Sequence, residues 1–398
     1  MTFNENPMIT NKHMLICLDK TDCDVIQIDY LLEHFCGKTL TKIDTFHLAT
    51  PDTLVYLCGD IQKIIDTNIE FRSDLVYIIS DLSTNFDNKY QQIRSGEVPI
   101  NIHGVGIYFR NLFLDTNYFE SISTEHEFQN LTESNKPNFA YRKAIYLSKV
   151  EETVDGLMFN ILRCSSNLTG GTDNFRKTDI NILDIVNCLA RLYFRKPVEI
   201  NHVLAQIYYN SEKSKAKIKA HSDKTKDMDP AGLIVFCTFY ESITNNLITQ
   251  SNTDPYDYVY KHQTSVLTEL VFKKKPSVID PYLVKEFRIK LYPNSCFMIN
   301  LETNRNYTHE IRPSTLPGEI IPTRLGYVCR NSNVKAVHRD GKTYIMYNDQ
   351  EIPMRNIDKN GAQLLRNKYF IENTTAEKVD YPFMDCSMNS GDLQPPMI

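Results

Sequence analysis

Residues 217–226, KIKAHSDKTK, contain a histidine and an aspartate that are candidate ligands of a metal ion. His221 and Asp223 lie two positions apart at the end of AKIKAH, a run that reads as a strand. Alternate residues of a strand point to the same face, so both side chains can reach one ion. An isolated pair of this kind is more often an ordinary polar contact than a metal site, so the rest of the sequence must decide.

A third candidate ligand follows later in the chain. His309 lies in NRNYTHEIRP, after the apolar run SCFMINLE. If this segment forms a strand next to that of His221, the His309 side chain can reach the same ion. Two imidazoles and one carboxylate that leave open positions on the metal are the ligands of non-haem Fe(II) oxygenases. We therefore expect His221, Asp223 and His309 to form one metal site.

The segment RLGYVCR adds two arginines, Arg324 and Arg330. Arg324 alternates with apolar residues in a segment that reads as half buried, and a guanidinium in such a place needs an anionic partner. A planar guanidinium can donate two parallel hydrogen bonds to one carboxylate, so it is a natural counter-charge for a dicarboxylate cosubstrate. The sequence therefore indicates an oxygenase.

The residues around these motifs predict an α+β fold. Short apolar runs such as HVLAQIYYN, GLIVFCTFYE, EFRIKLY and KTYIMYN read as strands, and Asp179 is a good N-cap for a helix over INILDIVNCLARLYF. A helix packed on many short strands favours a double-stranded β-helix, or jelly roll, with supporting helices. We expect this catalytic core to span residues 141–372.

The remaining segments read differently. Residues 1–140 predict a mixed α/β region of unknown role, in which HMLICLDK, DTLVYLCG and DLVYIISD are strands and CDVIQIDYLLEHFCGK is helical. No phosphate-binding glycine loop occurs there. Residues 123–139 are polar and read as a linker. Residues 373–398 are expected to form a C-terminal tail whose last part, CSMNSGDLQPPMI, is frayed.

Composition limits the setting and the partners. The chain has 398 residues, a formal net charge of −5 and ten cysteines, which are scattered singly as in a reducing compartment. It has no transmembrane segment, and its N-terminus lacks the pattern of a secretory signal, so we expect an intracellular protein, cytoplasmic or nuclear. Residues 201–350 contain 20 Lys+Arg and 15 Asp+Glu, a balance of +5 that permits a polyanionic substrate. The oligomeric state is not indicated.

Residues 200–340 resemble the AlkB-like family of Fe(II)/2-oxoglutarate-dependent dioxygenases, whose pattern is HxD, then H, then RxxxxxR. The resemblance implies that His221, Asp223 and His309 bind iron. It also implies that Arg324 pairs with the distal carboxylate of 2-oxoglutarate.

Three further residues match cosubstrate positions of the family. Tyr208 corresponds to the tyrosine that hydrogen-bonds the same carboxylate, and Gln206 stands where the family usually has asparagine. Arg330 matches the second arginine, which supports the cosubstrate and the metal-binding aspartate.

The resemblance implies Fe(II), 2-oxoglutarate and O2 as cofactor and cosubstrates. A ferryl intermediate would hydroxylate or oxidatively demethylate a nucleic-acid base, with release of succinate and CO2. The substrate would be single-stranded or carry a flipped base, which must stack on Tyr, Phe or His because the chain has no Trp. Thr225 stands where family members that repair alkylated bases often carry an acidic residue.

Three segments are candidates for substrate contact, each with an ordinary alternative. The loop NLTGGTDNFR, residues 167–176, is expected to be a mobile substrate lid in which Arg176 meets a phosphate, or else a plain surface loop. The basic clusters KSKAKIK, 213–219, and FKKKPS, 272–277, could follow a nucleic-acid backbone or protect strand edges.

Two other functions stay open from the sequence. The same chemistry could act on a protein side chain, or the chain could be a non-catalytic jelly-roll module with a relic or zinc site. Turnover of 2-oxoglutarate separates the enzymes from the module, and salt-sensitive binding of oligonucleotides separates the two kinds of substrate.

Overall fold

The protein is a mixed α/β chain built mostly of strands with few helices. The computed structural model describes residues 12–42, 52–66, 71, 73–114, 116–132, 139–164, 168–243 and 246–398. The chain divides into two compact units, residues 1–112 with 192–195, and residues 113–191 with 196–398. This division falls before the boundary near residue 140 that we expected from the sequence. No described helix is long and apolar enough to cross a membrane.

The first unit contains a parallel sheet of strand order β2-β1-β3-β4-β5. Its strands are β1 His13–Leu18, β2 Lys38–Leu40, β3 Leu54–Asp60, β4 Val76–Thr84 and β5 Gln91–Ile93. All six residues of β1 are buried, as expected for a parallel sheet with both faces covered. The other elements are α1 Val25–His34, α2 Ile61–Ile65, η2 Ser73–Leu75, η3 Ser95–Glu97, and the antiparallel pair β6 Ile100–Ile102 and β7 Gly106–Phe109.

The second unit contains two sheets that frame a cavity. The larger has the order β12-β9-β13-β25-β17-β23, with β8 paired to β9. Its strands are β8 Gln129–Thr132, β9 Phe139–Ser148, β12 Asp173–Asn174, β13 His202–Tyr208, β17 Leu233–Tyr240, β23 Ser295–Asn300 and β25 Arg324–Arg330. The smaller, of order β16-β24-β21-β22, is antiparallel and consists of β16 Ile218–His221, β24 Tyr307–Arg312, β21 Glu269–Lys274 and β22 Glu286–Lys290.

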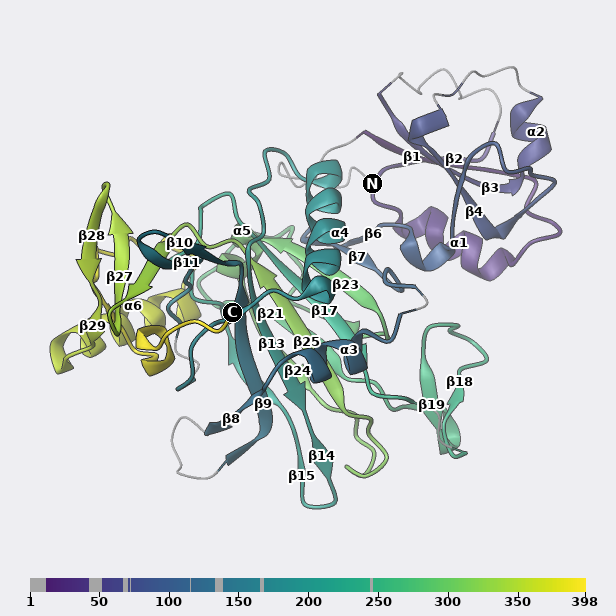
Figure 1. Ribbon diagram of the computed structural model, residues 1–398. Helices are drawn as coiled ribbons and strands as arrows, with labels where there is room; N and C mark the ends of the chain where they lie inside the picture. The colour runs from purple at the N-terminus through teal and green to yellow at the C-terminus, as the bar shows by residue number, and fades with distance from the viewer. Residues whose placement is uncertain are drawn as a thin grey trace. The chain divides into compact units, whose positions relative to one another are not determined.

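Alternate side chains of β25 point to opposite faces of the sheet, one facing the cavity and the other facing a helix. Arg324 and every second residue from it to Arg330 line the cavity. Tyr327 points the other way, and its hydroxyl donates to Asp179 Oδ1 over 2.6 Å. Asp179 belongs to α4, Lys177–Tyr193, which lies along this sheet in Figure 1. The predicted N-cap role is wrong, because Asp179 lies inside the first turn and its carboxylate accepts the backbone N–H of Arg176.

The other elements surround these sheets in the second unit. A further antiparallel sheet consists of β10 Val150–Thr153, β11 Gly156–Asn160, β26 Lys335–Arg339, β27 Lys342–Tyr347 and β28 Gln350–Pro353. Small strands are β14 Asn210–Ser211, β15 Ser214–Lys215, β18 Thr249–Gln250, β19 Tyr258–Tyr260 and β20 Thr264–Ser265. The helices are α3 Tyr118–Glu125, α5 Leu301–Asn306, α6 Lys359–Thr374 and η4 Lys261–Gln263.

The last residues are packed, so the frayed ending that we expected is wrong. Strand β30, Cys386–Ser387, pairs with β29, Arg355–Asn356, and is followed by the short helix η5, Ser390–Leu393. Asn389 and Asp392 are buried, and the backbone N–H of Met397 donates to the carbonyl of Thr172. Buried polar side chains with hydrogen-bond partners indicate a fixed conformation.

The same packing argues against the predicted mobile lid. Residue 167 lies outside the described residues, but the loop from 168 onward contacts the C-terminal segment. A Cβ atom on Gly171 would lie 2.1 Å from the carbonyl oxygen of Pro395, so only glycine fits there. Arg176 donates to Asp173 over 3.0 Å rather than being free for a phosphate.

Candidate metal centre

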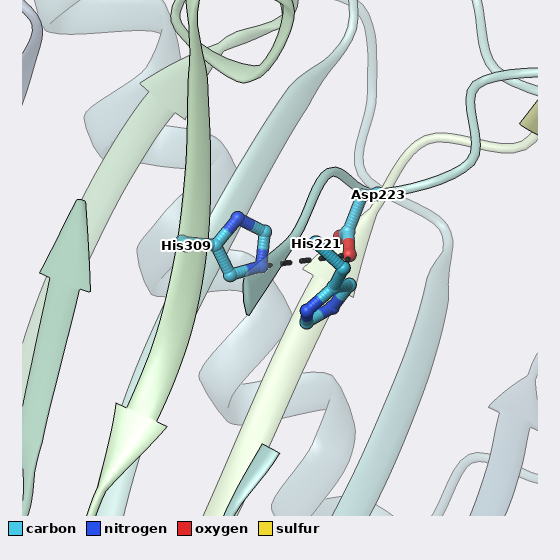
Figure 2. A group of neighbouring side chains, drawn as sticks. All are labelled: His221, Asp223 and His309. Atoms are coloured by element: carbon cyan, nitrogen blue, oxygen red, sulfur yellow. Dashed lines mark ion pairs between the residues drawn. The ribbon is translucent and has the colours of Figure 1, made fainter. Parts of the chain in front are cut away.

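The three predicted ligands converge on one point. His221 ends β16 and is the register partner of His309 on β24, and Asp223 follows two residues later. The Nε2 atoms of His221 and His309 lie 3.6 and 3.7 Å from Asp223 Oδ1. Figure 2 shows the three side chains pointing toward one another from the two strands and the loop. Their ligand atoms all lie within 4.8 Å of one another, so they could hold a metal ion.

The surroundings keep Asp223 and His309 in the protonation states that a metal requires. Burial opposes ionisation of Asp223, but Arg330, whose Nη2 lies 2.8 Å from Oδ2, acts together with His221 and His309 to outweigh burial and hold the pKa of Asp223 well below its usual range. Burial lowers the pKa of His309 to about 3, so this imidazole is neutral. Nδ1 of His221 donates to the carbonyl of Lys219 over 2.9 Å, which leaves the lone pair of its Nε2 available to a metal.

The donor set fits a ferrous ion. Two neutral imidazole nitrogens and one carboxylate oxygen form the open 2-His-1-carboxylate arrangement. Arg330 occupies Oδ2 of Asp223, so Oδ1 is the oxygen available to a metal. Phe236 and Phe272 lie against the His309 ring at 5.4 and 5.5 Å between centroids, and they make one wall of the site apolar.

The same cavity contains a buried cation, Arg324, for which the described residues provide no counter-charge. The three ligands and Arg324 line a cavity of about 250 Å³ between the two sheets. Arg324 is 3% exposed, and its Nε and Nη2 atoms have no hydrogen-bond partner among the described residues. Its guanidinium lies 4.0 Å from the centroid of the Tyr208 ring. A buried guanidinium with unused donors requires an anion, so this wall is suited to a carboxylate.

Gly326 makes room for that guanidinium. A Cβ atom on Gly326 would lie 2.8 Å from Nη1 of Arg324 and 3.2 Å from the Tyr208 ring. The absence of a side chain at this position therefore shapes the far wall of the cavity.

Tyr208 and Gln206 are both in the cavity but bond to each other. They lie on β13 as the register partners of Arg324 and Gly326, and the Tyr208 hydroxyl donates to Gln206 Oε1 over 2.7 Å. This bond leaves the amide nitrogen of Gln206 as the donor that can face a bound carboxylate. The predicted contact through the tyrosine hydroxyl stays a prediction.

Sequence reasoning missed several residues of this cavity. Arg142, the register partner of Tyr208 on β9, and Lys224, next to Asp223, both line it. Alternation along RKAIYLS could have indicated Arg142. Two asparagines that bond the loop around Asp223, Asn304 and Asn373, had no recognisable signal.

The two basic clusters differ in the structure. Lys213, Lys217 and Lys219 are exposed, so residues 213–219 keep a cationic surface. The 272–277 cluster does not, because Lys273 pairs with Glu310 over 3.2 Å and Lys275 is 2% exposed.

A second histidine–carboxylate cluster lies near the start of α4. Nδ1 and Nε2 of His126 lie 2.7 and 2.8 Å from carboxylate oxygens of Asp173 and Asp179. Burial opposes protonation of His126, but the two hydrogen bonds and the negative charges of Asp173 and Asp179 together outweigh it and raise the pKa of His126 to about 9. Both ring nitrogens are occupied, so we assign this cluster a structural role.

Comparison with known proteins adds little. No protein-family model and no curated protein matches the chain. Among solved structures, that of OsALKBH1 is similar with a TM-score of 0.32 and 13% identity, and the match covers 57% of this chain and 96% of that one. The likeness is weak, so a function for this chain must rest on its own side chains.

Proposed function

We propose that this protein is an Fe(II)- and 2-oxoglutarate-dependent dioxygenase with a jelly-roll core formed by the two sheets of the second unit. One observation carries the proposal. A 2-His-1-carboxylate cluster lines the same cavity as a buried guanidinium whose Nε and Nη2 have no hydrogen-bond partner in the described part of the chain. The cluster alone would fit other metals, and the guanidinium alone would fit other anions. Together they fit a metal and a dicarboxylate bound side by side.

The residues of the cavity have distinct tasks in this proposal. Bound iron with 2-oxoglutarate and O2 would supply the hydroxylation of a C–H bond, with release of succinate and CO2. His221, Asp223 and His309 would hold the ion, and Arg330 would keep the Asp223 carboxylate ionised and turned toward it. Arg324 would bind the distal carboxylate of the cosubstrate, and the apolar wall at Phe236 would limit the access of water.

For the substrate we propose a nucleic-acid base, hydroxylated or oxidatively demethylated in single-stranded or flipped form. The support is the positive charge of the site and its surroundings. Arg142 and Lys224 line the cavity, and Lys213, Lys217 and Lys219 are exposed on the segment that leads to His221. A protein side chain is the alternative, because the second basic cluster is largely occupied within the fold.

Succinate formation tests the chemistry. Protein reconstituted anaerobically with Fe(II) and then given 2-oxoglutarate and O2 should form succinate slowly even without a substrate. The His309→Ala variant should not. A wild-type protein that binds iron but never forms succinate would contradict the proposed function and favour a non-catalytic module.

Binding of oligonucleotides tests the substrate class. A nucleic-acid substrate predicts affinity for single-stranded DNA or RNA that falls steeply with salt. Lys217→Gln with Lys219→Gln should reduce that affinity. Indifference to both oligonucleotides would favour a protein substrate.

A further inference from the structure

The loop that carries Asp223 is held by side chains that lie far away in the sequence. This loop, residues 222–225, leaves the end of β16, where strand pairing stops. The backbone N–H groups of Ser222, Asp223 and Thr225 each donate to a side-chain oxygen from α5 or α6. A loop whose amides are bonded in this way has few other conformations available.

Asn304 of α5 holds the backbone of the metal-binding aspartate on both sides. Its Oδ1 accepts the N–H of Asp223 over 2.9 Å, and its Nδ2 donates to the Asp223 carbonyl over 3.0 Å. Asn304 is 2% exposed, so water cannot readily replace it. This pair fixes the backbone from which the carboxylate projects toward the two histidines.

Helix α6 provides the other contacts. Oδ1 of Asn373 accepts the N–H of Ser222 over 2.7 Å, while its Nδ2 donates to the carbonyl of Tyr369 over 2.8 Å and so sets the orientation of the amide. Oε1 of Glu372 accepts both the N–H and the hydroxyl of Thr225, over 3.0 and 2.6 Å.

Lys275 joins the two helices behind the loop. Its ammonium donates to the backbone carbonyls of Asn304, Glu372 and Thr375, at the end of α5 and the C-terminus of α6. Three carbonyl acceptors match the three N–H donors of an ammonium, and a cation is favourable at a helix C-terminus. The helices that hold the loop are therefore tied to each other.

We propose that Asn304 and Asn373 are positioning residues of the metal centre, and that α6 is thereby a working part of it. The inference rests on the proposed function. Each amide acts through the backbone of the loop: Asn304 bonds the backbone of Asp223 itself, and Asn373 bonds that of the preceding residue, Ser222. Loss of a hydrogen bond in the layer behind the ligands typically weakens metal binding about 10- to 100-fold.

Mn(II) binding to the full chain tests this proposal, since Mn(II) accepts the same ligands without reacting with O2. Titration calorimetry should show Asn373→Ala binding Mn(II) at least about tenfold more weakly than wild type. Asn373→Asp keeps an oxygen for the N–H of Ser222 but lacks the N–H that donates to the Tyr369 carbonyl, so it should recover only part of the affinity. Asn367→Ala, on the exposed side of the same helix, is the matched control and should bind like wild type.

The outcomes distinguish a failure of the positioning role from a failure of the proposed function. If wild type binds Mn(II) and Asn373→Ala binds equally well, the positioning role is refuted while the proposed function stands. If wild type binds no metal, the proposed function fails and the positioning role with it. Should Asn373→Ala unfold, Thr225→Val decides instead, because it removes only the hydroxyl bond to Glu372 and should also weaken Mn(II) binding.

Discussion

Replacement of Arg324 should raise the stability of the ligand-free protein and lower its affinity for 2-oxoglutarate. Replacement by methionine removes the guanidinium but keeps a long side chain against the Tyr208 ring. Arg324 is a buried cation, and two of its nitrogen atoms have no hydrogen-bond partner among the residues that the structure describes. Arg324→Met should therefore stabilise the ligand-free protein and weaken the binding of 2-oxoglutarate.

The changes in stability and affinity can be estimated from the unmade hydrogen bonds of the guanidinium and from its bonds to a carboxylate. An unsatisfied buried polar group costs about 1–3 kcal/mol. The contact with the Tyr208 ring contributes about 0.5–2 kcal/mol in the other direction. With mid-range values of about 2 and about 1 kcal/mol, the net gain is about 1 kcal/mol, which should raise the melting temperature by about 2–4 °C in a domain of 150–250 residues. A buried carboxylate left without its partner costs about 3–5 kcal/mol, which is a loss of affinity of about 100- to 1,000-fold or more.

The assay pairs thermal unfolding of the metal-free protein with calorimetric titration of 2-oxoglutarate into the Mn(II)-loaded protein. Arg324→Lys is the informative companion, because a point charge replaces the fork and should retain part of the affinity. Lys143→Met, which removes a cation from the strand position next to Arg142, controls for loss of charge. Lower stability together with unchanged affinity in Arg324→Met would refute the anion-binding role.

Three other changes have defined outcomes. Gly326→Ala should weaken 2-oxoglutarate binding at least about tenfold without unfolding the protein, because the new Cβ would lie 2.8 Å from Arg324 Nη1. An affinity equal to that of wild type would show that the guanidinium can move aside. His309→Ala should abolish succinate formation and lower metal affinity while far-UV circular dichroism stays unchanged. The pKa of His126, raised to about 9, lies above its unfolded value of about 6.5, so its contribution to stability is full below pH 6.5 and is lost as pH rises through 9. The free energies of unfolding of wild type and His126→Gln, measured by chemical denaturation, should therefore differ by at most about 3 kcal/mol below pH 6.5 and converge above pH 9. A difference that grows with pH would contradict the pairing of a protonated His126 with Asp173 and Asp179.

The sequence predicted the parts of the site that follow from strand geometry. The two-residue spacing of His221 and Asp223, the strand that brings His309 beside them, and the alternation that turns Arg324 into the cavity are local properties. The α/β character of the first unit was also readable, because its buried strands are short apolar runs.

The rest of the site depends on contacts that no local pattern encodes. Asn304 and Asn373 lie 81 and 151 residues from the backbone groups that they bond, and an asparagine in a helix has no distinctive periodicity. Asp179 reads as an N-cap by residue type, but its carboxylate is shared with His126 and Tyr327 across the fold. The polar C-terminal residues read as frayed because their partners are elsewhere in the chain.

The central claim is that one cavity binds a metal at the histidine–aspartate cluster and a dicarboxylate at Arg324. The most direct measurement is a crystal structure of the protein grown anaerobically with Mn(II) and 2-oxoglutarate, with anomalous data to locate the ion. We expect an anomalous peak about 2.0–2.3 Å from His221 Nε2, Asp223 Oδ1 and His309 Nε2, with the distal carboxylate of 2-oxoglutarate bound by two parallel hydrogen bonds from Arg324. A metal bound elsewhere, or a cosubstrate that leaves the Arg324 guanidinium without an anion, would contradict it.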